Sequence, residues 1–256
     1  MDLPFESGSL RAPPPGVDAW SVDDAALDLW LAALGPVTSE ELATLSPDER
    51  ERAARRSPGL PPIFAASRIA LRCVLSDYVD RAPDELEFRY GRYGRPALAD
   101  ARGLDFNLSH SGSMALIAVV RGARVGVDLQ RVEPERDLRQ LARRFFAPEE
   151  AASLEGLEGS AFERAFFRLW CCKEAYLKAL GTSIAKLPSE SFCFRVDASD
   201  GARARLVASS WDAPGAETID DWCFALPEPP DGFVAAVGWT GGIRRLRVFG
   251  VARGAS

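Results

Sequence analysis

Helical hydrophobic patterns give way to strand patterns twice along this 256-residue sequence, and that order restricts the possible folds strongly. Helices are expected over residues 21–34, 46–56 and 64–78, and strands over 86–90, 104–108, 114–120 and 125–132. Helices return over 137–146 and 160–180, before strands over 192–197, 202–208, 221–226, 233–239 and 246–251. Because such runs are typical of α+β proteins, we predict an α+β fold made of two similar halves.

The two predicted halves meet near Gly122, which places an N-terminal half at residues 17–122 and a C-terminal half at 123–256. Residues 1–16 are rich in proline, glycine and serine and are expected to form a flexible tail. Two capping boxes predict helix starts, one at Ser46 with Glu49 and one at Ser160 with Glu163.

Composition excludes several classes of protein. The formal net charge of −6 disfavours a nucleic-acid binder that depends on a strongly basic surface. A single histidine, His110, excludes metal sites built from several histidines. The 5 cysteines contain no CxxC pair, which favours a reducing compartment. With no export signal and no long apolar run evident, we predict a cytoplasmic protein that binds neither nucleic acid nor membrane.

Two segments place acidic residues where they could meet. In the predicted strand around residue 128, Asp128 and Gln130 project from the same side because strand side chains alternate. In the predicted helix 160–180, Trp170, Glu174 and Lys178 follow at intervals of four and share a face. Taken singly, the strand is explained by a solvated face and the Glu–Lys pair by a surface interaction of about 0.2–0.5 kcal/mol.

The residues around Glu174 favour a functional interpretation, because apolar side chains surround the helix and a buried charge needs a partner. If Asp128 and Glu174 converge, two carboxylates about 4 Å apart repel by roughly 4 kcal/mol at an effective dielectric of 20. Such a pair requires a cation, and hard oxygen ligands without histidine or thiolate indicate Mg²⁺. Since Mg²⁺ commonly takes phosphate oxygens as further ligands, we expect a phosphoanhydride substrate.

A third segment, residues 106–112, reads Phe-Asn-Leu-Ser-His-Ser-Gly and predicts a strand that enters a turn of small residues. Ser109 and His110 would suit phosphate oxygens there, although a plain turn explains the segment equally well. As a hydrolase signal the Ser-His pair is weak, because catalytic partners must meet in space and no GxSxG motif is present. Arg52, Arg68 and Arg95 could supply bidentate phosphate contacts, although each alone is explained by solvated surface.

Four motifs in order resemble those of the Sfp-type 4′-phosphopantetheinyl transferases. They are Gly-Arg-Pro at 94–96, residues 106–112, Gly-Val-Asp-Leu-Gln at 126–130, and Trp-Cys-Cys-Lys-Glu-Ala-Tyr-Leu-Lys at 170–178. The resemblance implies a pseudo-dimer of two α+β halves with the active site between them. It also implies transfer of the phosphopantetheine arm of coenzyme A to a serine of an apo acyl, peptidyl or aryl carrier protein, with release of 3′,5′-ADP.

The resemblance assigns roles residue by residue. Asp128 and Glu174 are expected to bind Mg²⁺, and Lys178 to contact the diphosphate and assist the leaving group. Ser109 and His110 are expected at the coenzyme A phosphates. The basic residues Arg95, Arg68 and Arg52 occupy positions expected to bind coenzyme A, the last two near its 3′-phosphate.

Two positions depart from the family pattern. Gln130 stands where many members have a second strand carboxylate, so it is a candidate ligand through a neutral amide oxygen. Glu49 stands where a basic residue can occur, so no phosphate contact is assigned to it.

Two other functions fit the same residues. A Mg²⁺-dependent phosphodiester hydrolase could use the two carboxylates, and a non-catalytic module could bind coenzyme A without transfer. The family resemblance favours a monomeric, broad-specificity transferase serving polyketide or nonribosomal peptide synthesis.

Overall fold

The computed structural model describes residues 5–8, 26–56, 63–101, 103–133, 137–186, 188, 191–196, 203–209 and 218–251. Most strands in these segments belong to two five-stranded sheets. The first has the order β1 (Phe5–Gly8), β12 (Arg245–Val251), β2 (Ala26–Ala33), β6 (Met114–Arg121), β5 (Leu104–Ser111). The second has the order β7 (Val125–Arg131), β11 (Phe233–Thr240), β10 (Trp222–Ala225), β9 (Arg203–Ser209), β8 (Phe192–Val196). The predicted α+β class is confirmed.

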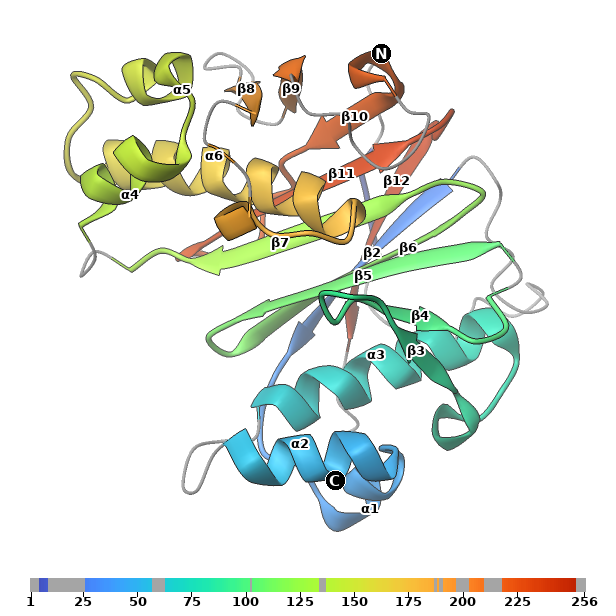
Figure 1. The fold of residues 1–256 in the computed structure, drawn as a ribbon. Coiled ribbons are helices and arrows are strands. Elements are labelled where there is room, and N and C mark those ends of the chain that lie inside the picture. The colour runs from blue at the N-terminus through green and yellow to red at the C-terminus, as the bar shows by residue number, and fades with distance from the viewer. Residues whose placement is uncertain are drawn as a thin grey trace.

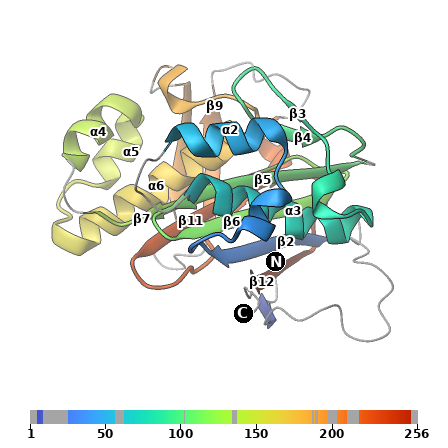
Figure 2. The same ribbon diagram turned by 90° about the horizontal axis from the view of Figure 1, so that it is seen from below.

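Each sheet carries one long helix. Helix α3 (Ile63–Val79) packs on the first sheet and α6 (Gly159–Ala179) on the second, on opposite sides of the central strands β5 and β7 (Figure 1). Figure 2 shows α2 and α3 together on the outer side of the first sheet. The remaining elements are α1 (Ser39–Ala43), α2 (Pro47–Arg56), α4 (Leu138–Phe145), α5 (Pro148–Ser153), the hairpin β3 (Phe88–Tyr90) and β4 (Pro96–Leu98), and the 3₁₀ turns Pro83–Glu85, Ile184–Lys186 and Ile219–Asp221.

The apolar residues form a large core under each long helix, a further core that joins the two sheets, and a small cluster of Leu45, Ala65 and Ile69 at α3. The joining core contains Leu27 and Leu116 from the first sheet and Val127, Leu129 and Val237 from the second. The chain crosses from one sheet to the other at the turn near Gly122, where the boundary between the predicted halves was placed. The structure thus has two helix-bearing sheets joined by a shared core, and the division into two similar halves stays a prediction.

The helix expected over residues 21–34 is wrong where the structure describes it, because Ala26–Ala33 form strand β2. This strand lies inside the sheet and is covered on both faces, with Leu29 in the core between the sheets and Trp30 in the core under α3. A strand buried on both faces loses the alternation of apolar and polar residues that distinguishes it from a helix.

The two predicted capping boxes have different outcomes. Helix α2 begins after Ser46, whose Oγ accepts the Glu49 N–H at 3.3 Å while the Glu49 carboxylate accepts the Ser46 N–H at 3.1 Å, so this box is confirmed. The box predicted at Ser160 is wrong, because helix α6 begins one residue earlier, at Gly159. Its cap residue is Glu158, which makes no side-chain capping bond. None of the helices in the described segments is long and apolar enough to cross a membrane.

Strand β12 belongs to the first sheet although it comes from the predicted C-terminal half. It runs parallel to β2 on one side and to β1 on the other, so Phe5–Gly8 of the predicted tail are paired as well. A buried carboxylate on β2 also binds β12. Asp28 of β2 is 0% exposed, and Arg247 of β12 donates to its two oxygens at 2.5 and 2.7 Å. Tyr78 of α3 donates to the same carboxylate at 2.6 Å, so helix and strands are joined through one charge.

Strand β7 and helix α6 approach so closely that only glycine fits at one point. A Cβ at Gly126 would lie 2.0 Å from the Ala175 carbonyl oxygen and 2.6 Å from the Ala179 nitrogen, both in the helix backbone. Gly126 shares a strand face with Asp128, so this close packing fixes the distance between Asp128 and the helix.

We predict that Gly126→Ala lowers the free energy of unfolding by about 3 kcal/mol or more, because neither backbone can move without breaking the packing. The matched control is Gly250→Ala in β12, where a new Cβ meets nothing within 4 Å. It should change stability by less than about 1 kcal/mol. Urea denaturation of both variants measures the difference, and equal losses would contradict the assigned close contact.

Candidate active site

The two sheets meet along an unusual junction between their edge strands β5 and β7. Alternate side chains of β5 accept hydrogen bonds from alternate backbone N–H groups of β7, at distances of 2.9, 2.9, 3.2 and 2.9 Å. The four pairs, acceptor first, are Asp105 with Val125, Asn107 with Val127, Ser109 with Leu129 and Ser111 with Arg131. We call this row of contacts the β5–β7 seam. It sets the register of β7 against β5, the edge strand of the first sheet.

Three predicted site residues meet at the third position of the seam. Ser109 Oγ donates to Asp128 Oδ1 at 2.9 Å, and Lys178 Nζ of α6 donates to Ser109 Oγ at 2.8 Å and to Asp128 Oδ1 at 2.6 Å. Asp128 is only 1% exposed, whereas the Lys178 side chain is 27% exposed. Ser109 therefore uses its hydroxyl proton and two acceptor sites inside the protein, and the ammonium neutralises a buried carboxylate.

Glu174 lies one helical turn before Lys178 and completes the cluster. Burial raises the pKa of the Glu174 carboxyl and Asp128 raises it further, while Lys178 and a hydrogen bond from the Ile184 backbone oppose the rise. The two carboxylates therefore repel each other across the β7–α6 interface. Gln130 donates its amide N–H to Asp128 Oδ2 at 3.2 Å, so its place as a metal ligand stays a prediction.

The donor set fits a divalent cation that is shared with a substrate. In the described residues, no group of three or more His, Cys, Asp or Glu side chains could hold a metal by itself. Mg²⁺ commonly binds one or two carboxylates and completes its shell with phosphate oxygens and water. Asp128 and Glu174 meet that requirement, because both are oxygen donors and their mutual repulsion is relieved by a cation.

The neighbouring Lys173 belongs to the structural part of the same helix. Its side chain is 1% exposed, and Nζ donates to Glu150 of α5 at 2.7 Å and to the Phe192 carbonyl of β8 at 3.1 Å. Two lysines of one motif thus have different surroundings, and only Lys178 reaches Asp128.

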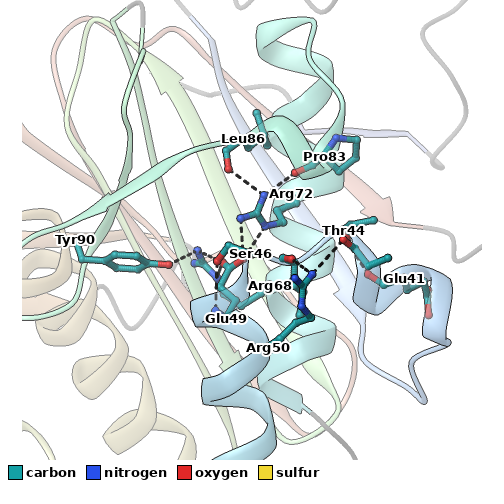
Figure 3. Close-up of polar contacts among 12 residues, drawn as sticks. Glu41, Thr44, Ser46, Glu49, Arg50, Arg68, Arg72, Pro83, Leu86 and Tyr90 are labelled. Atoms are coloured by element: carbon teal, nitrogen blue, oxygen red, sulfur yellow. Dashed lines mark hydrogen bonds and ion pairs between the residues drawn. The ribbon is translucent and has the colours of Figure 1, made fainter.

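Arg68 is held by a partner that sequence reasoning did not assign. Glu49 of α2 is 1% exposed and accepts from Arg68 Nε at 2.7 Å and from Arg72 Nε at 2.8 Å (Figure 3). Arg68 also donates to the Tyr90 hydroxyl at 3.1 Å, and the exposed Arg52 lies with its guanidinium carbon 4.9 Å from the Tyr90 ring centre. Arg52, Arg68 and Tyr90 therefore lie together, and Glu49 supplies the carboxylate that makes burial of two arginines possible.

Arg95 lies elsewhere, at the Asp105 end of the seam, where protein groups occupy both of its terminal nitrogens. His110 follows Ser109 near the exposed end of β5. The structure thus brings Ser109, Asp128, Gln130, Glu174 and Lys178 into one cluster and places Arg52 with Arg68 in a second group.

The residues that the sequence analysis missed are Glu49 as an internal partner and the seam acceptors Asp105, Asn107 and Ser111. A signal for the seam was present, because polar residues occupy positions 105, 107, 109 and 111 and therefore share one strand face. Nothing in that alternation named β7 as the partner. For Glu49, the capping box explained the residue fully and concealed its second role.

A family model described as the 4′-phosphopantetheinyl transferase superfamily matches residues 124–227, which include β7 and α6. The 4′-phosphopantetheinyl transferase HetI of Nostoc sp. is 39% identical over 203 residues, covering 78% of this chain and 80% of HetI. The chain belongs to this superfamily.

Two further similar proteins share less sequence with this chain. The 4′-phosphopantetheinyl transferase Sfp of Bacillus subtilis is 27% identical over 174 residues, covering 63% of this chain and 72% of Sfp. A crystal structure of holo-(acyl-carrier-protein) synthase from Bacillus anthracis in complex with coenzyme A aligns with a TM-score of 0.36 and 22% identity, covering 46% of this chain and 94% of that one. Membership of this superfamily and the similarity to HetI show that the chain is an enzyme of the transferase class, as the motif series indicated.

Glu49→Gln tests the buried cluster through its dependence on pH. Burial raises the pKa of Glu49, but Arg68, the Ser46 N–H and Arg72 outweigh burial and hold it below its ordinary value of 4.5. Because the folded-state pKa is lowered, the ionised carboxylate stabilises the fold above about pH 4.5 and loses that effect as pH falls through the folded value.

We predict that Glu49→Gln lowers the free energy of unfolding by about 3–5 kcal/mol near pH 7. The difference in this free energy between variant and wild type should become smaller in acid. Denaturation measured from pH 7 to pH 3 follows both effects. Glu51→Gln is the control, since Glu51 lies on the same helix in an exposed pair with Arg55 and should change stability by less than about 0.5 kcal/mol. A loss that does not vary with pH would contradict the ionic role of Glu49.

Proposed function

We propose that this transferase moves the 4′-phosphopantetheine arm of coenzyme A to a serine hydroxyl of an apo carrier protein and releases 3′,5′-ADP. The observation that supports this most directly is the cluster of Asp128, Glu174 and Lys178 beside the junction of the two sheets, in a chain that belongs to the family. Acyl, peptidyl or aryl carriers of polyketide or nonribosomal peptide synthesis are the proposed partners.

Asp128 and Glu174 are the proposed ligands of Mg²⁺, with Gln130 as a third candidate. When bound, Mg²⁺ supplies positive charge that neutralises the diphosphate during bond cleavage. Asp128 is suited to this role because its buried carboxylate is already held in place by Ser109 and Gln130.

The reaction forms a bond between the carrier serine oxygen and the phosphorus that carries the pantetheine arm, and it breaks the bond between that phosphorus and 3′,5′-ADP. Serine is a weak nucleophile near neutral pH and must lose its proton. Glu174 is proposed to accept that proton. The Lys178 ammonium is proposed to contact the diphosphate and to stabilise the charge that develops on the leaving phosphate.

Arg52, Arg68 and His110 are the proposed contacts of the coenzyme A phosphates, with the two arginines at the 3′-phosphate. Arg52 and Arg68 come together at Tyr90, and His110 lies at the exposed end of β5. Ser109 holds Asp128 and Lys178, so we propose that any contact of Ser109 with phosphate is secondary to this internal role.

Mass spectrometry of apo carriers incubated with the enzyme, coenzyme A and Mg²⁺ tests the proposed reaction. We expect the carrier to gain one phosphopantetheine, and expect no 3′,5′-ADP when the carrier is omitted. Asp128→Asn and Glu174→Gln should abolish the gain, and Lys178→Met should lower kcat by roughly 10²–10³-fold. Glu163→Gln on the same helix is the control and should retain activity.

The alternatives have distinct outcomes in the same assay. Release of 3′,5′-ADP without a carrier would favour the hydrolase, and coenzyme A binding without any product would favour the binding module. No mass gain with any of several acyl, peptidyl and aryl carriers would overturn the transferase proposal.

The proposed contact of Arg52 with the 3′-phosphate is tested by removing its charge. Arg52→Met should raise KM for coenzyme A by roughly 10-fold, because a charge-assisted hydrogen bond of about 1.5 kcal/mol is lost. The KM for 3′-dephospho-coenzyme A should change less than about twofold, since that substrate lacks the phosphate. Steady-state kinetics with both substrates measure the ratio, and equal changes in the two KM values would contradict the assignment.

A further inference from the structure

Arg95 in the β3–β4 hairpin contacts strands of both sheets and the end of α6. Nη1 donates to the carbonyl of Lys178 at 2.7 Å and to that of Ala179. Nη2 lies 2.8 Å from each oxygen of Asp105 and donates to the Val125 carbonyl at 2.9 Å. One guanidinium therefore joins the C-terminal turn of α6, the start of β7 and strand β5.

The contacts of Arg95 with α6 lie at the C-terminal end of the helix. The last carbonyls of a helix have no partner within the helix, and the final turn is its least stable part. Lys178 lies in that turn, one residue before α6 ends at Ala179. Its ammonium must nevertheless stay at the Asp128 carboxylate, 2.6 Å away. The Lys178 carbonyl also accepts the Gly181 N–H at 3.1 Å, so the Arg95 guanidinium adds a second donor there and binds the Ala179 carbonyl as well. Its positive charge complements the helix dipole.

Asp105 extends the same arrangement to the strand that carries Asp128. Its carboxylate accepts the Val125 N–H at 2.9 Å, which fixes the first residue of β7 three positions before Asp128. The same carboxylate pairs with Arg95. The Asp105 side chain is 30% exposed and the Arg95 side chain is 18% exposed. Both elements that carry the cluster, β7 and α6, are thus aligned through one ion pair.

From this geometry we infer that Arg95 is a positioning residue for Lys178, with Asp105 as its partner, and that it does not bind coenzyme A. The inference rests on the proposed role of Lys178 at the diphosphate. Arg95 acts on the leaving-group step through the end of α6, so its loss lowers turnover and leaves substrate binding unchanged. This replaces the expectation from the sequence that Arg95 contacts the substrate.

A kinetic double-mutant cycle tests the inference with coenzyme A, 3′-dephospho-coenzyme A and one apo carrier. Arg95→Met should lower kcat by roughly 10- to 100-fold, with KM for coenzyme A changed less than twofold. The ratio of kcat/KM for the two substrates should stay as in wild type. In the Lys178→Met background, the added Arg95→Met change should lower kcat less than about threefold, because the residue on which it acts is gone.

Two further variants calibrate the measurement. Arg81→Met removes an arginine of the same half that forms an exposed ion pair with Asp100, and it should leave kcat and both KM values unchanged. Arg52→Met shows how the substrate ratio changes when a proposed 3′-phosphate contact is lost. If Arg95→Met does not fold by circular dichroism, Arg95→Lys and Asp105→Asn take its place in the cycle. A lysine cannot satisfy Asp105 and the helix carbonyls together.

Two results would overturn the inference. A rise in KM for coenzyme A with loss of the substrate ratio would make Arg95 a phosphate ligand. Equal losses of kcat with and without Lys178 would mean that Arg95 supports the fold generally and does not act through Lys178. Both results are measured against an active wild-type enzyme. A wild-type enzyme that transfers nothing would instead contradict the proposed function.

Discussion

The position of every group in the cluster depends on the β5–β7 seam. Two edge strands from different sheets would ordinarily pair through their backbones or remain apart. Here four side chains of β5 accept the backbone N–H groups of β7, so the sheets are joined in one register. Because strand faces alternate, a slip of one residue would turn Asp128 away from α6. The seam therefore fixes which side of β7 faces the helix that carries Glu174 and Lys178.

The sequence predicted elements and faces better than it predicted partners. The spacing in α6 placed Glu174 and Lys178 on one face, and the alternation in β7 placed Asp128 on the side of Gly126, as the structure has them. The strand at Ala26–Ala33 was missed, because burial on both faces removed the alternation. Pairings such as Asp28 with Arg247 are separated by 219 residues, and a local pattern carries no information about them.

The two arginines show how a partner decides function. The sequence offered Arg68 and Arg95 equally as phosphate ligands, since a guanidinium suits phosphate wherever it is exposed. In the structure each is paired with a carboxylate, Glu49 for Arg68 and Asp105 for Arg95. Arg68 lies beside Tyr90 and Arg52, whereas Arg95 uses both terminal nitrogens on protein acceptors. The carboxylate that pairs with each arginine therefore determines which other groups its guanidinium can contact.

The position of β12 has a consequence for how the chain is made. Strand β2 lies between β6 and β12, so the first sheet is incomplete until residues near 250 are available. During synthesis the ribosome releases residues from the N-terminus onward, and the parallel partner of β2 emerges after the whole second sheet. Until then one edge of β2 has no strand to pair with, and the Asp28 carboxylate lacks its partner Arg247. The second sheet, whose strands all lie between residues 125 and 240, can form before the first is closed.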